Sequence, residues 1–286
     1  MAPYLVLFMT FTVVPAVLGI WISLHRFNYL LPRQPFSGLQ NYIDLVTPGS
    51  AVFSLFWDSM KASAIFVATS VPLLIVIPLL VALLLNKRIR GRTFFRAVFF
   101  APFVLGVAVV SNMWRYLLDP NIGLVNQLLN QVGIHAFVGW TTSLPWAWIS
   151  LVGVTVWWTL GFNAVIFLAG LQNIDRQLYD AADVDGASRW QSFRYVTLPG
   201  LRPVTFFILI ETTLASANMF GQSLLITHGA PGTSTQTAIM YIASEGLGHY
   251  QMGSAAAMSY VLALFLALIS VMYFRTLGRR DPGFRR

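Results

Sequence analysis

The stretch LYDAADVDGASRWQSFRYVTLPGLRP, residues 178–203, is a polar, charge-bearing segment that separates two long apolar runs. Gly186 is a lone glycine, and Ser188 is followed three residues later by Gln191, the capping-box spacing in which each side chain satisfies a free amide at a helix start. Proline disfavours helical geometry in the residue before it, which marks a stop near Pro199. The stretch therefore predicts a helix ending near Gly186, a turn, and a second short helix from Ser188 to about Pro199.

The second short helix is predicted to carry an aromatic face. Trp190, Phe193 and Thr197 recur at the spacing i, i+3 and i+7, so their side chains share one side of a helix. A short helix between apolar runs that shows aromatics on one side is expected to press them into a partner.

Composition indicates a membrane protein. Hydrophobic residues make up 57% of the chain and charged residues 10%, whereas soluble domains average about 25% charged residues. Apolar runs near the length that a helix needs to cross the hydrocarbon predict six spans. The first run lacks a basic leading segment, so we expect a true span rather than a signal peptide. The predicted fold is an all-α membrane protein of one domain, residues 1–286, with spans near 3–24, 60–85, 94–117, 145–170, 203–227 and 254–275.

The distribution of the eighteen basic residues predicts the orientation of these spans. Fourteen lie in the second connection, the fourth connection and the tail: Lys87, Arg88, Arg90, Arg92, Arg96, Arg176, Arg189, Arg194, Arg202, Arg275, Arg279, Arg280, Arg285 and Arg286. Only Arg26, Arg33, Lys61 and Arg115 fall at the opposite face. The positive-inside rule therefore puts residues 172–203 and both termini in the cytoplasm. Because topology accounts for most of the net charge of +8, we expect no nucleic-acid partner.

The loops carry weaker signals. Residues 25–46 fit either an aromatic stretch along the membrane interface or a plain loop. Leu124, Leu128 and Leu129 have the spacing of a short amphipathic helix. Residues 227–258 are typical of a loop followed by a closely packed helix start.

Polar side chains interrupt two of the predicted spans. Glu211 is a carboxylate inside an apolar run, which is costly unless it is paired, protonated or wetted, and it is therefore a candidate functional residue. Hydroxyls and amides near it could bond their own helix or neighbouring helices, or could line an aqueous cavity. The number of such groups in this span favours the cavity. Trp157 and Trp158 lie deep in the fourth span, where they either pack against helices or line a cavity.

Several classes of chemistry have no motif in this chain. The two lysines, Lys61 and Lys87, do not follow glycine, so no phosphate-binding loop is present. The chain also has no zinc-protease motif, no nucleophile elbow and no cysteine. We therefore expect no catalytic residue, no metal and no cofactor in this chain, and an energy source in a partner.

The polar stretch resembles the EAA motif of the membrane subunits of bacterial ATP-binding cassette importers. Asp180-Ala181-Ala182, Asp185-Gly186-Ala187 and Leu198-Pro199 match it, with Asp180 in place of the usual glutamate. Other segments are similar to the first permease of the carbohydrate-uptake class, which includes the maltose and glycerol-phosphate permeases. These are residues 36–42, Arg92 to Arg96 with Pro102, Asp119-Pro120 with Gly123 and Asn126, Thr227 to Pro231 with Thr237, and residues 252–257.

The resemblance implies an assembly. It implies a type I importer transmembrane domain in the bacterial inner membrane, in contact with lipid. It also implies a second homologous permease, a cytoplasmic ATPase dimer that binds ATP and Mg²⁺, and an extracytoplasmic solute-binding protein. Residues 172–203 would be the coupling loop, and the residues implied to contact the ATPase are Asp180, Ala181, Ala182, Asp185, Gly186, Ala187, Trp190, Phe193, Leu198 and Pro199.

The resemblance further implies a sugar near the membrane midplane, against the spans that flank the coupling loop. The expected ligand contacts are Trp157, Leu160, Gly161, Glu211, Thr212, Ser216 and Asn218. One alternative is a permease of the same class for a different solute. Another is an ion-coupled carrier that uses Glu211 as its ion site, although no internal repeat supports it. A membrane enzyme would need a catalytic constellation that the chain lacks.

Overall fold

A computed structural model describes residues 2–87, 90–134 and 137–276 of the chain. Arg88, Arg279, Arg280, Arg285 and Arg286, which entered the orientation argument, lie outside these ranges. The described part is mostly helical and has no strand, apart from one isolated bridge between His25 and Phe36. The elements are α1 (Ala2–Phe8), η1 (Met9–Val13), α2 (Val14–Ser23), α3 (Gln40–Val46), α4 (Phe53–Asn86), α5 (Arg92–Val104), α6 (Val107–Leu117), α7 (Leu124–Gln131), α8 (Trp146–Gln172), α9 (Arg176–Val184), α10 (Arg189–Ser192), η2 (Phe193–Thr197), α11 (Leu198–Gly200), α12 (Arg202–Ala217), η3 (Ser223–Thr227), α13 (Ala238–Ala243), η4 (Ser244–Gly248) and α14 (Met252–Thr276).

Four of the helical segments are long and apolar enough to cross a membrane unaided: Pro3–Ser23, α4, α8 and α14. The first, α8 and α14 agree with the predicted spans. α4 begins at Phe53 rather than near residue 60. Asp58 and Lys61 lower the hydropathy of its first turns, but a helix needs apolar side chains only where it meets hydrocarbon. α4 also passes through Pro72 and Pro78 as one helix.

The third and fifth predicted spans are not single helices. α5 and α6 meet at 98°, because the chain is extended at Leu105 and Gly106, three residues after Pro102. α12 ends at Ala217, and the helix resumes only at Gly221. The segment 189–200 and α12 also form a bent pair, at 63°. Averaged hydropathy cannot detect these breaks, since the residues at them are as apolar as their neighbours or only weakly polar.

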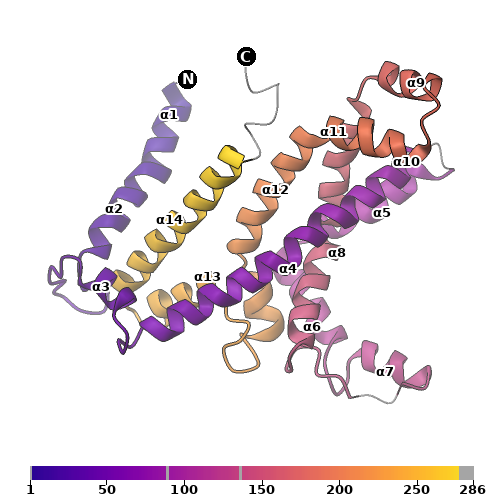
Figure 1. The fold of residues 1–286 in the computed structure, drawn as a ribbon. Helices are drawn as coiled ribbons and strands as arrows, with labels where there is room; N and C mark the ends of the chain where they lie inside the picture. The colour runs from indigo at the N-terminus through magenta and orange to yellow at the C-terminus, as the bar shows by residue number, and fades with distance from the viewer. Residues whose placement is uncertain (1, 88–89, 135–136, 277–286) are drawn as a thin grey trace.

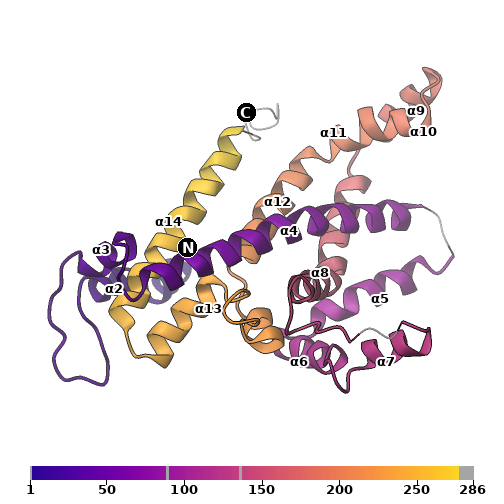
Figure 2. The ribbon, with the colours of Figure 1, turned by 60° about the horizontal axis from the view of Figure 1, so that its bottom comes forward.

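The ribbon shows how the helices are arranged (Figure 1). α4 runs obliquely across the molecule and packs on α8 and on α12. The start of α1, the end of α14 and the α9–α11 segment lie toward one end of the molecule, whereas α3, α6 and α7 lie toward the other. The turned view keeps α9 and α10 at one extremity (Figure 2).

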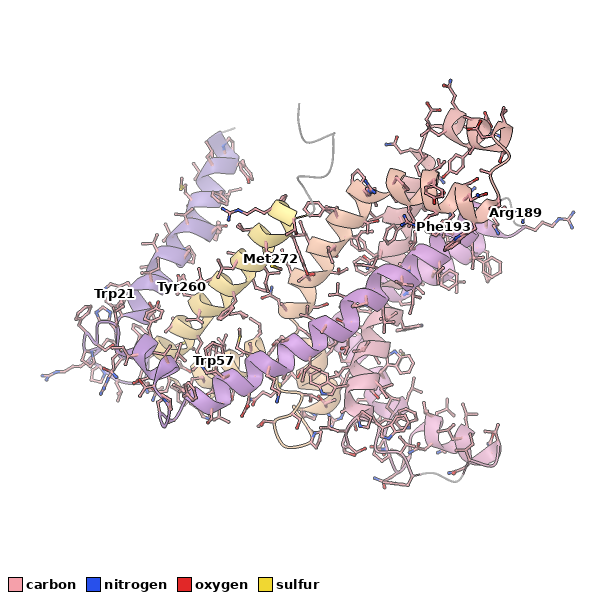
Figure 3. All side chains as sticks on the ribbon, in the orientation of Figure 1. Trp21, Trp57, Arg189, Phe193, Tyr260 and Met272 are labelled. Atoms are coloured by element: carbon pink, nitrogen blue, oxygen red, sulfur yellow. The ribbon has the colours of Figure 1, made fainter. Side chains whose placement is uncertain are left out.

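The first helix is attached to the rest mainly through α14. Tyr260 of α14 donates a hydrogen bond to the Ala16 carbonyl, and its ring lies between the two helices (Figure 3). Ser23 is the one buried residue recorded between Pro3 and Ser23. The core lies elsewhere, in apolar clusters centred on Phe66 and Leu151, on Phe167 and Ile208, and on Phe56 and Met258.

Candidate functional site

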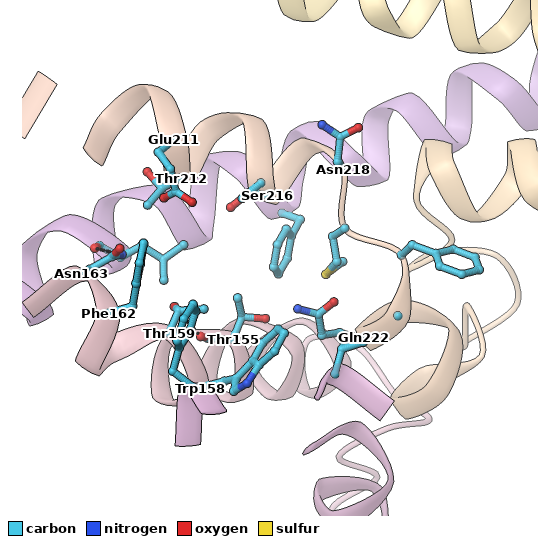
Figure 4. A pocket seen from close by; sticks show the side chains of 18 residues that line it. Thr155, Trp158, Thr159, Phe162, Asn163, Glu211, Thr212, Ser216, Asn218 and Gln222 are labelled. Atoms are coloured by element: carbon cyan, nitrogen blue, oxygen red, sulfur yellow. Dashed lines mark hydrogen bonds between the residues drawn. The ribbon is translucent and has the colours of Figure 1, made fainter. Parts of the chain in front are cut away.

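A cavity of about 310 Å³ lies between α8 and α12 (Figure 4). The residues that line it from α8 and α12 are Thr155, Trp158, Thr159, Phe162, Asn163, Glu211, Thr212, Ala215 and Ser216. Residues 218–222, which follow α12, complete the wall, and Phe66, Leu74, Phe103 and Val107 add apolar surface. The cavity therefore lies where the two helices that flank residues 172–203 face one another.

One stripe of α8 faces this cavity. Thr155, Trp158, Thr159, Phe162 and Asn163 follow the spacing i, i+3, i+4, i+7 and i+8, and such positions share one side of a helix. Trp158 and Phe162 bring aromatic rings to the wall, and Phe162 stacks on Phe103 of α5 at 4.6 Å and 15°. Asn163 is committed to the structure, because its Nδ2 donates to the Leu74 carbonyl at 3.1 Å.

The structure does not bring the three ligand contacts predicted on α8 to this cavity. Trp157 and Leu160 lie on another side of the helix, where they line an apolar groove with Leu73 and Ile77 of α4. Each residue turns the helix by about 100°, so the adjacent side chains of Trp157 and Trp158 lie on different faces. Trp158 and Phe162 occupy the cavity wall instead, and their spacing with Thr155 and Asn163 is the sequence signal that would have identified them.

Gly161 has a packing role. A Cβ atom at this position would lie 2.2 Å from the Phe99 carbonyl oxygen and 2.5 Å from the Phe100 Cα. Only a glycine allows α8 and α5 to approach this closely. The contact keeps α5 close enough for Trp158 Nε1 to donate to the Leu105 carbonyl at 3.1 Å.

The four ligand contacts predicted after the fourth span do come together. Glu211, Thr212, Ser216 and Asn218 all line the cavity. Two of the hydroxyls also have internal partners: Thr212 Oγ1 donates to the Ile208 carbonyl at 2.6 Å, and Ser216 Oγ accepts from Ser70 Oγ at 3.2 Å. These hydroxyls therefore both bond neighbouring protein groups and line the cavity, the two roles that the sequence left open.

Glu211 sets the electrostatics of the cavity. It is half-buried and is the one ionisable residue among those that line the wall. Across the described ranges its carboxylate has no ion-pair partner within 4.0 Å. With aromatic faces on one side and hydroxyls, amides and one carboxylate on the other, the cavity suits a polar ligand that carries hydroxyl groups and no negative charge.

The predicted geometry of the polar stretch is confirmed. α9 ends in a Schellman motif: Gly186 has φ +72°, its N–H donates to the Asp183 carbonyl at 3.1 Å, and Ala187 N–H donates to the Ala182 carbonyl at 2.9 Å. α10 begins with a capping box, in which the Ser188 N–H donates to Gln191 Oε1 at 2.7 Å. Both devices fix the turn between the helices.

The aromatic face of this loop is only partly as predicted. Trp190 is 68% exposed and its ring lies 5.6 Å from that of Phe193, which is half-buried. Thr197 does not share the exposed face, because the η2 segment turns as a π-helix and buries it against Tyr179, with the two hydroxyls 3.0 Å apart. Val184 and Tyr195 of the same loop are also exposed, which the helical spacing did not reveal. Figure 3 shows the Arg189 side chain near Phe193, pointing away from the molecule.

The carboxylates of the loop, Asp180, Asp183 and Asp185, are exposed. Asp185 forms the C-terminal cap of α9 through its backbone. Within the part of the chain that the structure describes, no group of three His, Cys, Asp or Glu side chains converges on a point where a metal could bind.

Comparisons with known proteins agree on one family. Residues 49–286 match the model described as "Binding-protein-dependent transport system inner membrane component". The trehalose/maltose transport system permease protein MalF of Thermococcus litoralis is 34% identical, over 99% of this chain and 92% of that protein. The arabinooligosaccharides transport system permease protein AraP of Halalkalibacterium halodurans is 32% identical, over 99% of this chain and 87% of that protein.

A solved structure is similar in fold. It is a chain of a bacterial alginate ABC transporter in complex with its alginate pentasaccharide-bound periplasmic protein. The TM-score is 0.83, the sequence identity is 22%, and the match covers 98% of this chain and 93% of that chain.

Proposed function

The chain belongs to the family of binding-protein-dependent transport system inner membrane components, and from this premise we propose that it is a permease subunit of an ATP-driven sugar importer. The cavity between α8 and α12, with aromatic rings facing hydroxyls and amides, is the observation that carries the proposal. Stacking on apolar sugar faces and bonding to sugar hydroxyls require this combination. The sugars in the names of the two relatives support the same substrate class.

In the proposed topology the chain crosses a bacterial inner membrane six times, with each bent pair taken as one crossing, and both termini are cytoplasmic. The bias of basic residues supports this orientation. The start of α1, the end of α14 and the α9–α11 segment also lie toward the same end of the molecule (Figure 1).

The proposed importer contains further subunits. A second, homologous permease would supply the other half of the pathway, and a cytoplasmic ATPase dimer would bind ATP and Mg²⁺, for which this chain has no phosphate-binding loop. An extracytoplasmic solute-binding protein would deliver the ligand. The complex of the alginate transporter with its periplasmic protein supports this last partner. This chain itself would hold no cofactor.

Residues 172–203 would couple the ATPase to the cavity. The Schellman motif and the capping box make the loop rigid, and Trp190 presents an exposed anchor at its surface. Because α8 leads into this loop and α12 leads out of it, closure of the ATPase dimer would shift the two helices that line the cavity. Such a shift would switch access to the cavity from the outside to the cytoplasm. An ion-coupled carrier would leave the loop without a role, so it is not favoured.

Ligand contact on this chain is assigned to Trp158 and Phe162 on one wall and to Glu211 and Asn218 on the other. Glu211 accepts hydrogen bonds from sugar hydroxyls and repels carboxylate groups. The permease therefore favours neutral or amino sugars over acidic ones. Asn218 is exposed, and although its Nδ2 donates to the Leu214 carbonyl at 2.8 Å, its Oδ1 remains an acceptor.

The test is uptake by the assembled complex in lipid vesicles, with trehalose, maltose and an alginate oligosaccharide as probes. We expect ATP-dependent uptake of at least one neutral sugar and a gain in uptake of the acidic oligosaccharide, relative to the neutral sugar, when Glu211→Gln removes the charge. Glu245→Gln is the matched control, since Glu245 bonds His249 at 3.0 Å and does not line the cavity. Absence of uptake of every neutral sugar would overturn the proposal. An unchanged preference in Glu211→Gln would remove Glu211 from the site.

A further inference from the structure

Five buried hydroxyl groups lie within or against the segment that joins α12 to α13. We call them the hydroxyl cluster, which consists of Ser63, Ser223, Thr227, Thr235 and Thr237. Each is no more than 5% exposed. Ser63 belongs to α4, Ser223 and Thr227 belong to η3, and Thr235 and Thr237 lie in the connection that precedes α13. None of them lines the cavity.

The hydroxyl cluster joins both ends of this segment. Thr237 Oγ1 donates to the Met219 carbonyl at 2.6 Å, eighteen residues away along the chain. Ser223 Oγ donates to the Thr235 carbonyl, and the hydroxyls of Thr227 and Thr235 lie 2.8 Å apart. These bonds draw residues 219–227 and 235–237 together.

The cluster is also anchored to the longest helix. Ser63 Oγ accepts the N–H of Ala238 at 2.9 Å, which attaches the end of the segment to α4. Thr235 Oγ1 additionally donates to the Ala230 carbonyl at 2.8 Å, so the turn around Pro231 is held from inside. The segment is therefore fixed to the body of the protein by side-chain hydroxyls rather than by a regular helix.

Residues 219–222 form the wall of the cavity where α12 has ended. Met219, Phe220, Gly221 and Gln222 all line it. Met219 lies between the end of α12 and the helix that resumes at Gly221, and its buried carbonyl accepts the Thr237 hydroxyl as its side-chain donor. A buried carbonyl that loses its donor is costly, which makes this one bond important for the position of the wall.

We propose that Thr237 is a positioning residue for the ligand: through the Met219 carbonyl it holds residues 219–222 in place as the wall of the cavity. The hydroxyl cluster is the device that makes this hold rigid. The role of Thr237 in ligand choice rests on the proposed function, whereas its hydrogen bond to the Met219 carbonyl does not.

The test uses the absence of cysteine from the chain. Met219 is 3% exposed, so Met219→Cys in the assembled complex should react slowly with a charged methanethiosulfonate reagent. Adding Thr237→Val removes the donor at nearly constant volume and should raise the labelling rate roughly tenfold. Thr237→Ser should return the slow rate. Thr69→Val is the matched control, because the Thr69 hydroxyl bonds its own helix at the Ile65 carbonyl.

The functional arm compares maltose with trehalose uptake by the same variants without the added cysteine. A displaced wall changes the ratio of the two uptake rates, and Thr237→Ser restores it, whereas a smaller amount of folded complex lowers both rates equally. If Thr237→Val does not accumulate in the membrane, Ser223→Ala tests the same cluster. An unchanged labelling rate in the variant that accumulates overturns the positioning role. Absence of sugar uptake in the unmodified complex contradicts the proposed function alone, since labelling needs no transport.

Discussion

Gly161→Ala is expected to separate two helices and to deform the cavity that one of them lines. The added methyl group would lie 2.2 Å from the Phe99 carbonyl oxygen. A retreat of α5 by about 1.2 Å would bring that distance to an ordinary contact of 3.4 Å. Since the obstacle is backbone, no side-chain rotation can relieve it. The stack of Phe103 on Phe162, at 4.6 Å, would open with the same movement.

The size of the effect follows from two opposing terms. Overpacking a close contact costs about 1–3 kcal/mol, while alanine in place of glycine favours a helix by about 1 kcal/mol. Gly153→Ala isolates the second term, because Gly153 lies on the same helix and a Cβ there meets no atom within 4 Å. We therefore expect Gly161→Ala to be less stable than Gly153→Ala by about 1–3 kcal/mol.

The assay is thermal unfolding of the detergent-solubilised complex, followed by sugar uptake in vesicles. Gly161→Ala should melt at a lower temperature than Gly153→Ala and should take up sugar more slowly, because its aromatic wall is displaced. Equal melting temperatures and equal uptake would refute the reasoning. That result would mean that α5 and α8 can separate without cost.

Two further outcomes are expected. Gly186→Trp places a side chain at φ +72°, with a strain of about 1–2 kcal/mol; it should abolish uptake while the complex still reaches the membrane, whereas Gly49→Trp, at φ +95° in the connection between α3 and α4, should retain it. Normal uptake in Gly186→Trp would argue against coupling through this loop. Asp119 accepts the N–H groups of Ile122 at 3.1 Å and Asn121 at 2.8 Å, which lowers the pKa of its carboxyl group. The ionised carboxylate should therefore stabilise the turn fully at pH values above the ordinary pKa of 3.8. This stabilisation should be lost as the pH falls through the lower pKa of the folded state. Hydrogen exchange at these two amides, corrected for intrinsic rates, should show that loss in the unmodified chain and no such pH dependence in Asp119→Ala.

Local signals in the sequence predicted the polar loop well. The capping box at Ser188 and the helix end at Gly186 both depend on residues within a few positions of each other, so the sequence contains all that determines them. The polar face of α12 could also be predicted from the sequence, because Glu211 and Ser216 are polar residues in an apolar run. Both residues line one cavity in the structure. Their contact with a ligand stays a prediction.

The face that α8 turns to the cavity could not be predicted in the same way. Trp157 and Trp158 are adjacent and chemically alike, and apolar residues lie on every side of α8. Only the sparse spacing of Thr155, Thr159 and Asn163 marks the face that lines the cavity. The break after Ala217 was also missed. At this break the Met219 carbonyl is bonded by Thr237, eighteen residues away along the chain, and local sequence patterns do not reveal such a contact.

The 34 residues of α4 have a consequence for how the protein sits in lipid. At about 1.5 Å per residue the helix is about 51 Å long, and even at a steep tilt of about 40° it spans about 39 Å along the bilayer normal. The hydrocarbon layer is about 30 Å thick. At least one end of α4 therefore stands among the lipid head groups at any common tilt. A change in the tilt of α4 would therefore raise or lower that end relative to the lipid head groups.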